Sequence, residues 1–482
     1  MKRYINNYII IIFSAALVIL SACNEDELLF PAPQTSLTDA NIFETPQRVL
    51  GLVNGFYNGL KANYFYGGRY VMYGDFRGED FVNITNNIFT GYDTWSHTVN
   101  SNSNEVELLW RDAYLTINLA NFFIDGIQRN PGVVSESLAN QYIGEAKFVR
   151  ALSYFALVTL YARPYTEDAG ASPGLPLRLQ AETDTENNDL ARSSVAQVYA
   201  QILSDLNDAE NSLPATHSTA LLNTTRAHKN TAIALKTRVY LSMGDHAKVI
   251  EEASKIVSET APFTATSGVA HQLHPDILEI FRTNYTSPES IFSMPMTELS
   301  SSTGQNSLGF IYNVSAEYFL NPEGIWGKAD WRTVDARRSM FRVNNGRYFM
   351  TKYAKPAPFL DFVPVIRYSE VLLNYAEALA LTGNLSRSLQ LLEAVRHRSD
   401  PDFSFPIEAV STSDALLETI LTERRIELIG EGFRSNDLLR LLRPLPAKGS
   451  SSLFAPEITP SQTEYIFPMP NLEIINNKAL MN

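Results

Sequence analysis

Apolar residues recur at spacings of three and four along much of the chain, which is the pattern of a helix with one buried face. Thr45 before Pro46 is typical of a helix start, and Ser194 stands where it can cap another helix. We therefore predict a mostly α-helical protein. The clearest helical stretches are 46–62, 110–121, 145–161 and 195–209.

Two further stretches, 226–258 and 367–399, resemble each other. Each has small residues set against large ones, a Gly-Asp or Gly-Asn turn, and then a second apolar stripe. They resemble tetratricopeptide-like helix pairs, which must stack to bury their apolar faces. The segments 145–213 and 413–440 are the natural third and fourth pairs. Ordinary helical hairpins without a superhelix are the alternative.

Two long segments, 63–103 and 259–366, show no sustained period. We predict that they are loop-rich ligand-side insertions with a few short strands, such as 290–294. Long irregular segments inside a compact domain are often functional. The predicted helical scaffold comprises 46–62, 104–258 and 367–445.

The stretch 423–440 combines an apolar helical face with many charges. Glu427 and Glu431 are four residues apart and would repel each other on a helix, so at least one should have a partner elsewhere. Gly430 and Gly432 disfavour a helix, which indicates a close packing contact or a bend. A solvated amphipathic helix with a glycine kink is the alternative.

This stretch also resembles the R-x-x-E-L-x-x-E-G-x-R-x-x-D-L-x-R signature of the SusD/RagB family of nutrient-capturing outer-membrane lipoproteins. Ser435 and Asn436 depart from it, because the family often has aromatic residues there. Further family features fall in 110–121, 145–161 and 467–473. The matching signature residues, for which we expect a structural role, are Arg424, Glu427, Leu428, Glu431, Gly432, Arg434, Asp437, Leu438 and Arg440.

The N-terminus has the features of a lipoprotein signal. Residues 1–22 join a basic start to an apolar run too short to span a membrane, and Leu-Ser-Ala precedes Cys23 in the manner of a lipobox. We expect Cys23 to carry lipid and 23–45 to form a tether. An acidic run at 24–27 resembles an export tag to the outer face of the outer membrane. A membrane anchor with an incidental cysteine, and a merely solvated acidic run, are the alternatives.

The composition of the chain argues against several classes of partner and site. The net charge is −13 and we find no basic run, which argues against nucleic acid as a partner. The single cysteine excludes an internal disulfide and a Cys-rich metal site. We find no catalytic or nucleotide-binding motif. His271 and His274 share a suggestive spacing, but ordinary surface histidines are the favoured interpretation, so we expect no metal and no cofactor.

Aromatic residues in the insertions are candidate sugar contacts, because a sugar ring packs its C–H face on a flat ring and its hydroxyls bind polar side chains. Trp95 and Trp326 are equally compatible with core packing, and we assign Trp110, on a helical stripe, to the core. The candidate ligand-binding residues are Arg69, Tyr92, Trp95, Trp326 and Trp331.

The resemblance implies one SusD-like domain over 46–482 that binds an oligosaccharide and delivers it to a SusC-like TonB-dependent transporter. The protein would lie on the outer membrane, lipid-anchored and facing the cell exterior, and would not be an enzyme. A peptide ligand, as in RagB-like uptake, stays open. A surface glycoside hydrolase and a purely structural partner of the transporter are less favoured alternatives.

Overall fold

A computed structural model describes residues 42–184, 188–282, 285–302, 304–450 and 452–480. The predicted signal peptide, Cys23 and most of the tether lie outside these residues. The long helices are α3 (Pro46–Leu60), α6 (Asn104–Arg129), α7 (Glu136–Tyr161), α9 (Val195–Ser212), α11 (Lys229–Met243), α12 (His246–Ser254), α14 (Tyr368–Leu381), α15 (Leu385–Ser399) and α16 (Ser413–Glu427).

Shorter helices complete the helical part. They are α4 (Arg69–Phe76), α5 (Tyr92–Ser96), α8 (Tyr165–Asp168), α10 (Ala220–Thr225), α13 (Ile277–Arg282), α17 (Arg434–Arg440) and α18 (Asn471–Asn476). The strands are β1 (Phe81–Asn83), β2 (Ser290–Met294), β3 (Tyr318–Leu320), β4 (Phe341–Asn344), β5 (Arg347–Met350), β6 (Val363–Arg367), β7 (Lys448–Gly449) and β8 (Phe454–Ala455).

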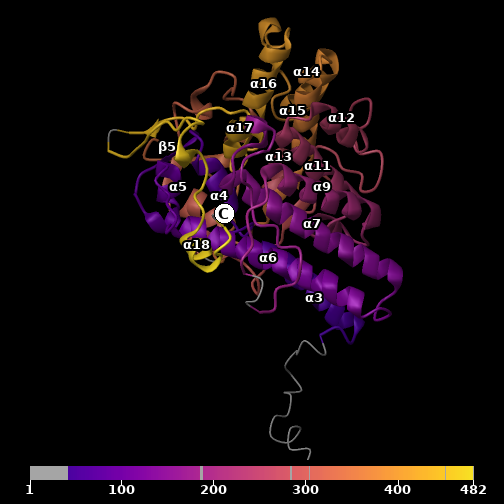
Figure 1. The fold of residues 1–482 in the computed structure, drawn as a ribbon. Coiled ribbons are helices and arrows are strands. Elements are labelled where there is room, and N and C mark those ends of the chain that lie inside the picture. Colours follow the sequence, from indigo (N-terminus) through magenta and orange to yellow (C-terminus); the bar gives the residue numbers. More distant parts are fainter. Residues whose placement is uncertain (1–41, 185–187, 283–284, 303, 451, 481–482) are drawn as a thin grey trace, which may run out of the picture.

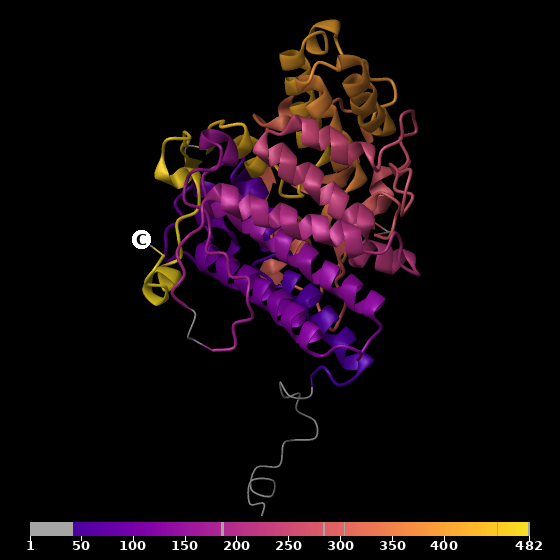
Figure 2. The same ribbon diagram turned by 45° about the vertical axis from the view of Figure 1, so that its right-hand side comes forward.

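The helices stack in sequence order. Helix α7 packs against α6 and α9, α9 against α11, α12 against α14, and α14 against α15 and α16. The ribbon colours in Figures 1 and 2 accordingly run from purple through pink to orange across the stack. The prediction of stacked helix pairs is confirmed, because single helices of this kind bury their apolar stripes only against neighbours.

Several predicted helix ends and turns agree with the structure, but α6 begins six residues and α7 nine residues earlier than predicted. Thr45 caps α3, and Ser194 caps α9 with its hydroxyl 3.2 Å from the Gln197 N–H. The two predicted hairpins are α11–α12 and α14–α15, and Gly244 and Gly383 adopt left-handed conformations at their turns. The predicted strand at 290–294 is β2, which pairs with β6.

The prediction of an irregular 63–103 is wrong in part, since α4 and α5 lie within it. Both helices are too short to display a period in the sequence, and α4 forms where it packs against α17. Strand β1 pairs with β3, so the insertion 63–103 and the insertion 259–366 meet although they are far apart in sequence.

The signature stretch is two helices rather than one. Helix α16 ends at Glu427 and α17 begins at Arg434, with Gly430 and Gly432 at φ +80° and +84° between them. A Cβ on Gly432 would lie 2.8 Å from the Val71 carbonyl oxygen, and a Cβ on Gly430 would lie 2.5 Å from Met350 Sδ. The two glycines therefore supply both the bend and the close contact that the sequence predicted.

Candidate functional site

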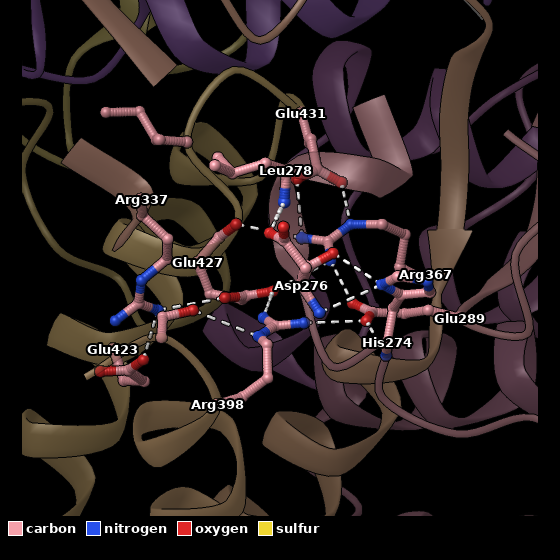
Figure 3. Close-up of polar contacts among 12 residues, drawn as sticks. His274, Asp276, Leu278, Glu289, Arg337, Arg367, Arg398, Glu423, Glu427 and Glu431 are labelled. Carbon is pink, nitrogen blue, oxygen red and sulfur yellow. Dashed lines mark hydrogen bonds and ion pairs between the residues drawn. The ribbon is translucent and has the colours of Figure 1, made fainter. Parts of the chain in front are cut away.

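The signature glutamates belong to a buried charge network, which we define as Glu289, Arg337, Lys352, Arg367, Arg398, Glu423, Glu427 and Glu431. Figure 3 labels all of these residues except Lys352. Glu427 accepts hydrogen bonds from Arg398 at 2.6 Å and Arg367 at 2.9 Å. Arg367 also pairs with Glu431 at 2.7 Å. Both signature glutamates thus have partners outside their own stretch, which confirms the prediction that at least one of them would.

The network joins distant parts of the chain. Arg367 ends β6, Glu289 precedes β2, and Arg337 and Lys352 belong to the second insertion. Because removing one partner from a buried ion pair leaves an uncompensated charge, such a network specifies how these segments fit together.

Neighbouring cations set the charge state of the network. Burial alone would raise the pKa of Glu427, but Arg398, Arg367 and Arg337 outweigh burial and hold that pKa well below its usual range. Asp75, beside Gly432, shows the opposite case. The pKa of Asp75 is raised to about 8, because the effect of burial exceeds the opposing effect of hydrogen bonds from the Tyr312 hydroxyl and the Gly432 N–H.

The remaining signature charges also pair inside the protein. Arg424 donates to Asp437 at 3.0 Å, and Arg440 donates to the same carboxylate at 2.9 Å. Arg434 pairs with Glu79 at 2.6 Å, which ties α17 to the first insertion. The solvated-helix alternative is therefore wrong, and these groups are not free to contact a ligand.

Three of the five candidate ligand residues are buried. Trp95 has no exposed surface and donates from Nε1 to the Phe81 carbonyl oxygen at 2.8 Å. Trp331 and Arg69 are buried as well. Direct ligand contact by these three residues is contradicted in this structure, because the surrounding core takes up their surfaces.

The other two candidates, Tyr92 and Trp326, are half-buried. Trp326 is held between two neighbours, with the Arg338 guanidinium 4.1 Å from its ring centroid and the Tyr348 ring at 4.5 Å. Both residues lie in the predicted insertions. The structure leaves them partly accessible without showing a ligand contact.

Exposed residues of the insertions include Ile88, Phe89, Val314 and Val343, which together with the half-buried Asn313 we call the loop surface; Leu299 and Val334 are also exposed and lie outside this definition. Phe89 is 60% exposed and follows the amides of Asn86 and Asn87. Arg342 donates to Asn313 at 2.8 Å, so β4 adjoins this surface. Sequence reasoning missed Phe89; an aromatic residue in an Asn-rich stretch was the available signal.

Buried polar groups hold the loop that carries Phe89. Arg69 donates to the Phe89 carbonyl oxygen and, at 3.1 Å, to Asn306 Oδ1. Tyr318 of β3 donates to the Thr90 carbonyl oxygen at 3.0 Å. Arg69 therefore positions the exposed ring instead of touching a ligand itself.

A separate pocket of about 360 Å³ lies between α6, α18 and the segment near Arg178. Trp110 lies at this α6–α18 pocket, largely buried, and its Nε1 is 3.3 Å from a Glu473 carboxylate oxygen. The assignment of Trp110 to the core is confirmed. The other lining residues include Arg111, Tyr114, Leu115, Asn118, Asn121, Pro470 and Leu472.

The suggestive histidine pair is not a pair of surface residues. His271 is buried and its ring stacks on His228 at 5.2 Å. Within the described residues, no three His, Cys, Asp or Glu side chains come together as a metal ion requires. No helix in the described ranges has the length and apolar character needed to cross a membrane.

Comparison with known proteins places this fold. A family model described as "Starch-binding associating with outer membrane" matches residues 51–241, and the SusD family model matches 360–482. A crystal structure of a SusD superfamily protein from Bacteroides fragilis is 33% identical, with a TM-score of 0.84 over 92% of this chain and 100% of that one. The chain belongs to the SusD family.

More distant relatives agree with this assignment. SusD-like protein P2 of Formosa agariphila is 26% identical over 100% of this chain and 99% of its own. A laminarin-binding SusD-like protein shares the fold at 21% identity, with a TM-score of 0.70 over 90% of this chain and 98% of its own. The predicted mostly α-helical, SusD-like fold of this SusD-family protein is confirmed.

Proposed function

We propose that this SusD-family protein binds oligosaccharide at the loop surface and passes it to a SusC-like TonB-dependent transporter in the outer membrane. The observation that carries the proposal is Phe89, an exposed ring on a loop fixed by the buried Arg69. An exposed aromatic ring offers a flat apolar face on which the C–H face of a sugar can pack, and the neighbouring amides can hydrogen-bond its hydroxyls.

The roles of individual residues follow from their positions. Phe89 would carry the C–H face of a sugar ring, while Asn86, Asn87 and Asn313 would bind its hydroxyls. The half-buried Tyr92 and Trp326 would contribute at the margins. The family description and the laminarin-binding relative support a glycan over a peptide as ligand.

Localisation is part of the same proposal. The family description names an association with the outer membrane. A lipid on Cys23 would anchor the protein there without a spanning segment, with the domain facing the cell exterior. We expect binding and release without turnover, because delivery benefits from modest affinity and rapid dissociation.

Calorimetric titration of the protein against panels of oligosaccharides and peptides tests the proposal. We expect heat with an oligosaccharide and a loss of affinity of at least tenfold in Phe89→Ala. Ile407→Ala is the control, because Ile407 is also an exposed apolar residue but lies beside α16, outside both insertions. Equal affinity in the two variants would contradict the proposed site, heat with peptides alone would contradict the glycan, and formation of a shortened sugar would indicate a hydrolase.

A further inference from the structure

Two leucines that line the α6–α18 pocket, Leu115 and Leu472, are exposed, and each has a further exposed aliphatic residue close by on its own helix. Leu115 and Leu119 of α6 are 57% and 43% exposed, and Leu472 and Ile475 of α18 are 50% and 61% exposed. Residues three or four apart share a helix face, so each pair forms a short stripe. Contiguous exposed apolar surface of this kind usually marks a place where something binds.

Sugar is a poor match for this pocket. Asn118 uses both ends of its amide on the backbone of Glu182, at 2.8 and 2.9 Å. Asn121 donates to the Arg178 and Gln180 carbonyl oxygens. Arg178 is paired with Glu182 and Glu473. These three polar side chains of the pocket are thus committed to partners within the protein, and the exposed aliphatic side chains beside them favour an apolar polypeptide segment.

The chain itself approaches this pocket along α6. The Phe43 ring packs at 6.0 Å from Phe122, and a Cβ on Gly126 would lie 2.1 Å from a Phe43 ring carbon. Leu115, Leu119, Phe122 and Gly126 follow one another at spacings of four, three and four, so they lie on one stripe of α6. Phe43 covers one end of that stripe and leaves the leucines uncovered.

The preceding segment contains a suitable apolar cluster. Leu28, Leu29 and Phe30 stand together in the predicted tether, which lies outside the described residues. Phe30 is 13 positions before Phe43, so an extended chain reaches about 45 Å. Leu115 is only about 10 Å along α6 from Phe122. Covalent attachment also gives the cluster a high effective concentration at the pocket.

We propose that Leu28–Phe30 of the same chain docks into the α6–α18 pocket. The docked cluster covers the four exposed aliphatic side chains of α6 and α18. If Cys23 carries lipid as proposed above, docking places the lipid five residues from the pocket. The α6–α18 face then lies toward the membrane, and the tether sets the orientation of the domain.

Disulfide trapping tests the docking in the chain from residue 23 onward, which keeps the whole tether and omits the predicted signal peptide. Cys23→Ser removes the only native thiol, and Leu29→Cys is combined with Leu115→Cys, Leu472→Cys or the control Leu221→Cys. Leu221 is also exposed, and its short helix leads to Arg226, which packs on Tyr142 near Phe123, so it is within reach of the same tether. Introduced cysteines at exposed leucines leave the core intact, which thermal unfolding of the reduced variants verifies.

We expect disulfides from position 29 to positions 115 and 472 to form at least tenfold faster than the disulfide to position 221. Non-reducing electrophoresis and peptide mapping measure the rates. Equal rates at all three positions would show an undocked tether and overturn the proposal. Failure at both 115 and 472 would also overturn it and leave the pocket to another apolar partner.

Discussion

Arg367 in the buried charge network and Arg342 beside the loop surface show two uses of the same side chain. Arg367 is buried and satisfied by Glu289, Glu427 and Glu431. Arg342 is half-buried and donates to Asn313. The ion pairs of Arg367 join segments of the fold, whereas the hydrogen bond of Arg342 leaves polar groups at the surface. The charged residues of the family signature form ion pairs of the first kind, so the signature specifies the fold. We propose that ligand recognition depends on loops that carry no signature.

The largest expected difference is in stability. Arg367→Met should lower the free energy of unfolding by about 3–5 kcal/mol, because it leaves buried carboxylates without a counter-ion. Arg443→Met is the control, since Arg443 pairs with Glu418 at the surface and the change should cost less than about 1 kcal/mol. Urea denaturation measures both. Equal small effects would contradict a stabilising network.

The glycine turn should show a smaller effect. A Cβ at Gly132 would lie in open space, so Gly132→Ala at φ +87° should lower the free energy of unfolding by about 1–2 kcal/mol through backbone strain alone. Gly432→Ala has a similar φ but also meets the Val71 carbonyl oxygen, so it should cost more. Thermal unfolding of the two variants compares them. An equal loss would mean that the bend, and not the contact with α4, requires Gly432.

Stability should also depend on pH in two opposite ways. The network carboxylates Glu427 and Glu431 have lowered pKa values in the folded state, so the contribution of these two residues is complete above about pH 5 and is lost in acid. Asp75 has a pKa of about 8 when folded against an ordinary value of 3.8, so folding takes up a proton between about pH 4 and pH 8. Its contribution therefore falls as pH rises from about 5 to 8, by at most about 1.4 kcal/mol per pH unit.

Asp75→Asn isolates the second effect. The amide cannot titrate, so the decline in unfolding free energy between pH 5 and 8 should become shallower than in the wild type. Urea denaturation at several pH values measures the slope. An unchanged slope would show that Asp75 stays ionised in the folded protein.

The elements of the fold that could be predicted from the sequence were those with a clear apolar period. The helix pairs were predictable from the apolar spacing and the glycine turns. The bend at Gly430 and Gly432 was predictable because glycine is unfavourable in a helix. The short helices α4 and α5 were not predictable, because each packs against a segment that is distant from it in the sequence. The partners of Glu427 were equally hidden, because they come from Arg337, Arg367 and Arg398.

The candidate site was predicted less well, because the contacts that decide it are not local in sequence. Trp95 and Phe89 are six residues apart in the same Asn-rich segment, yet the first is buried and the second is 60% exposed. Which of them faces solvent depends on the pairing of β1 with β3, which joins two insertions distant in sequence. A tryptophan in a polar loop therefore does not by itself identify a sugar contact.

The most direct test measures oligosaccharide affinity in Arg434→Ala. Arg434 belongs to the signature and pairs with Glu79, but its side chain is partly accessible, so the variant should remain folded. Our account predicts a lower melting temperature and a dissociation constant within twofold of the wild type. A tenfold loss of affinity in the folded variant would contradict the assignment of the signature to structure and of recognition to the loop surface.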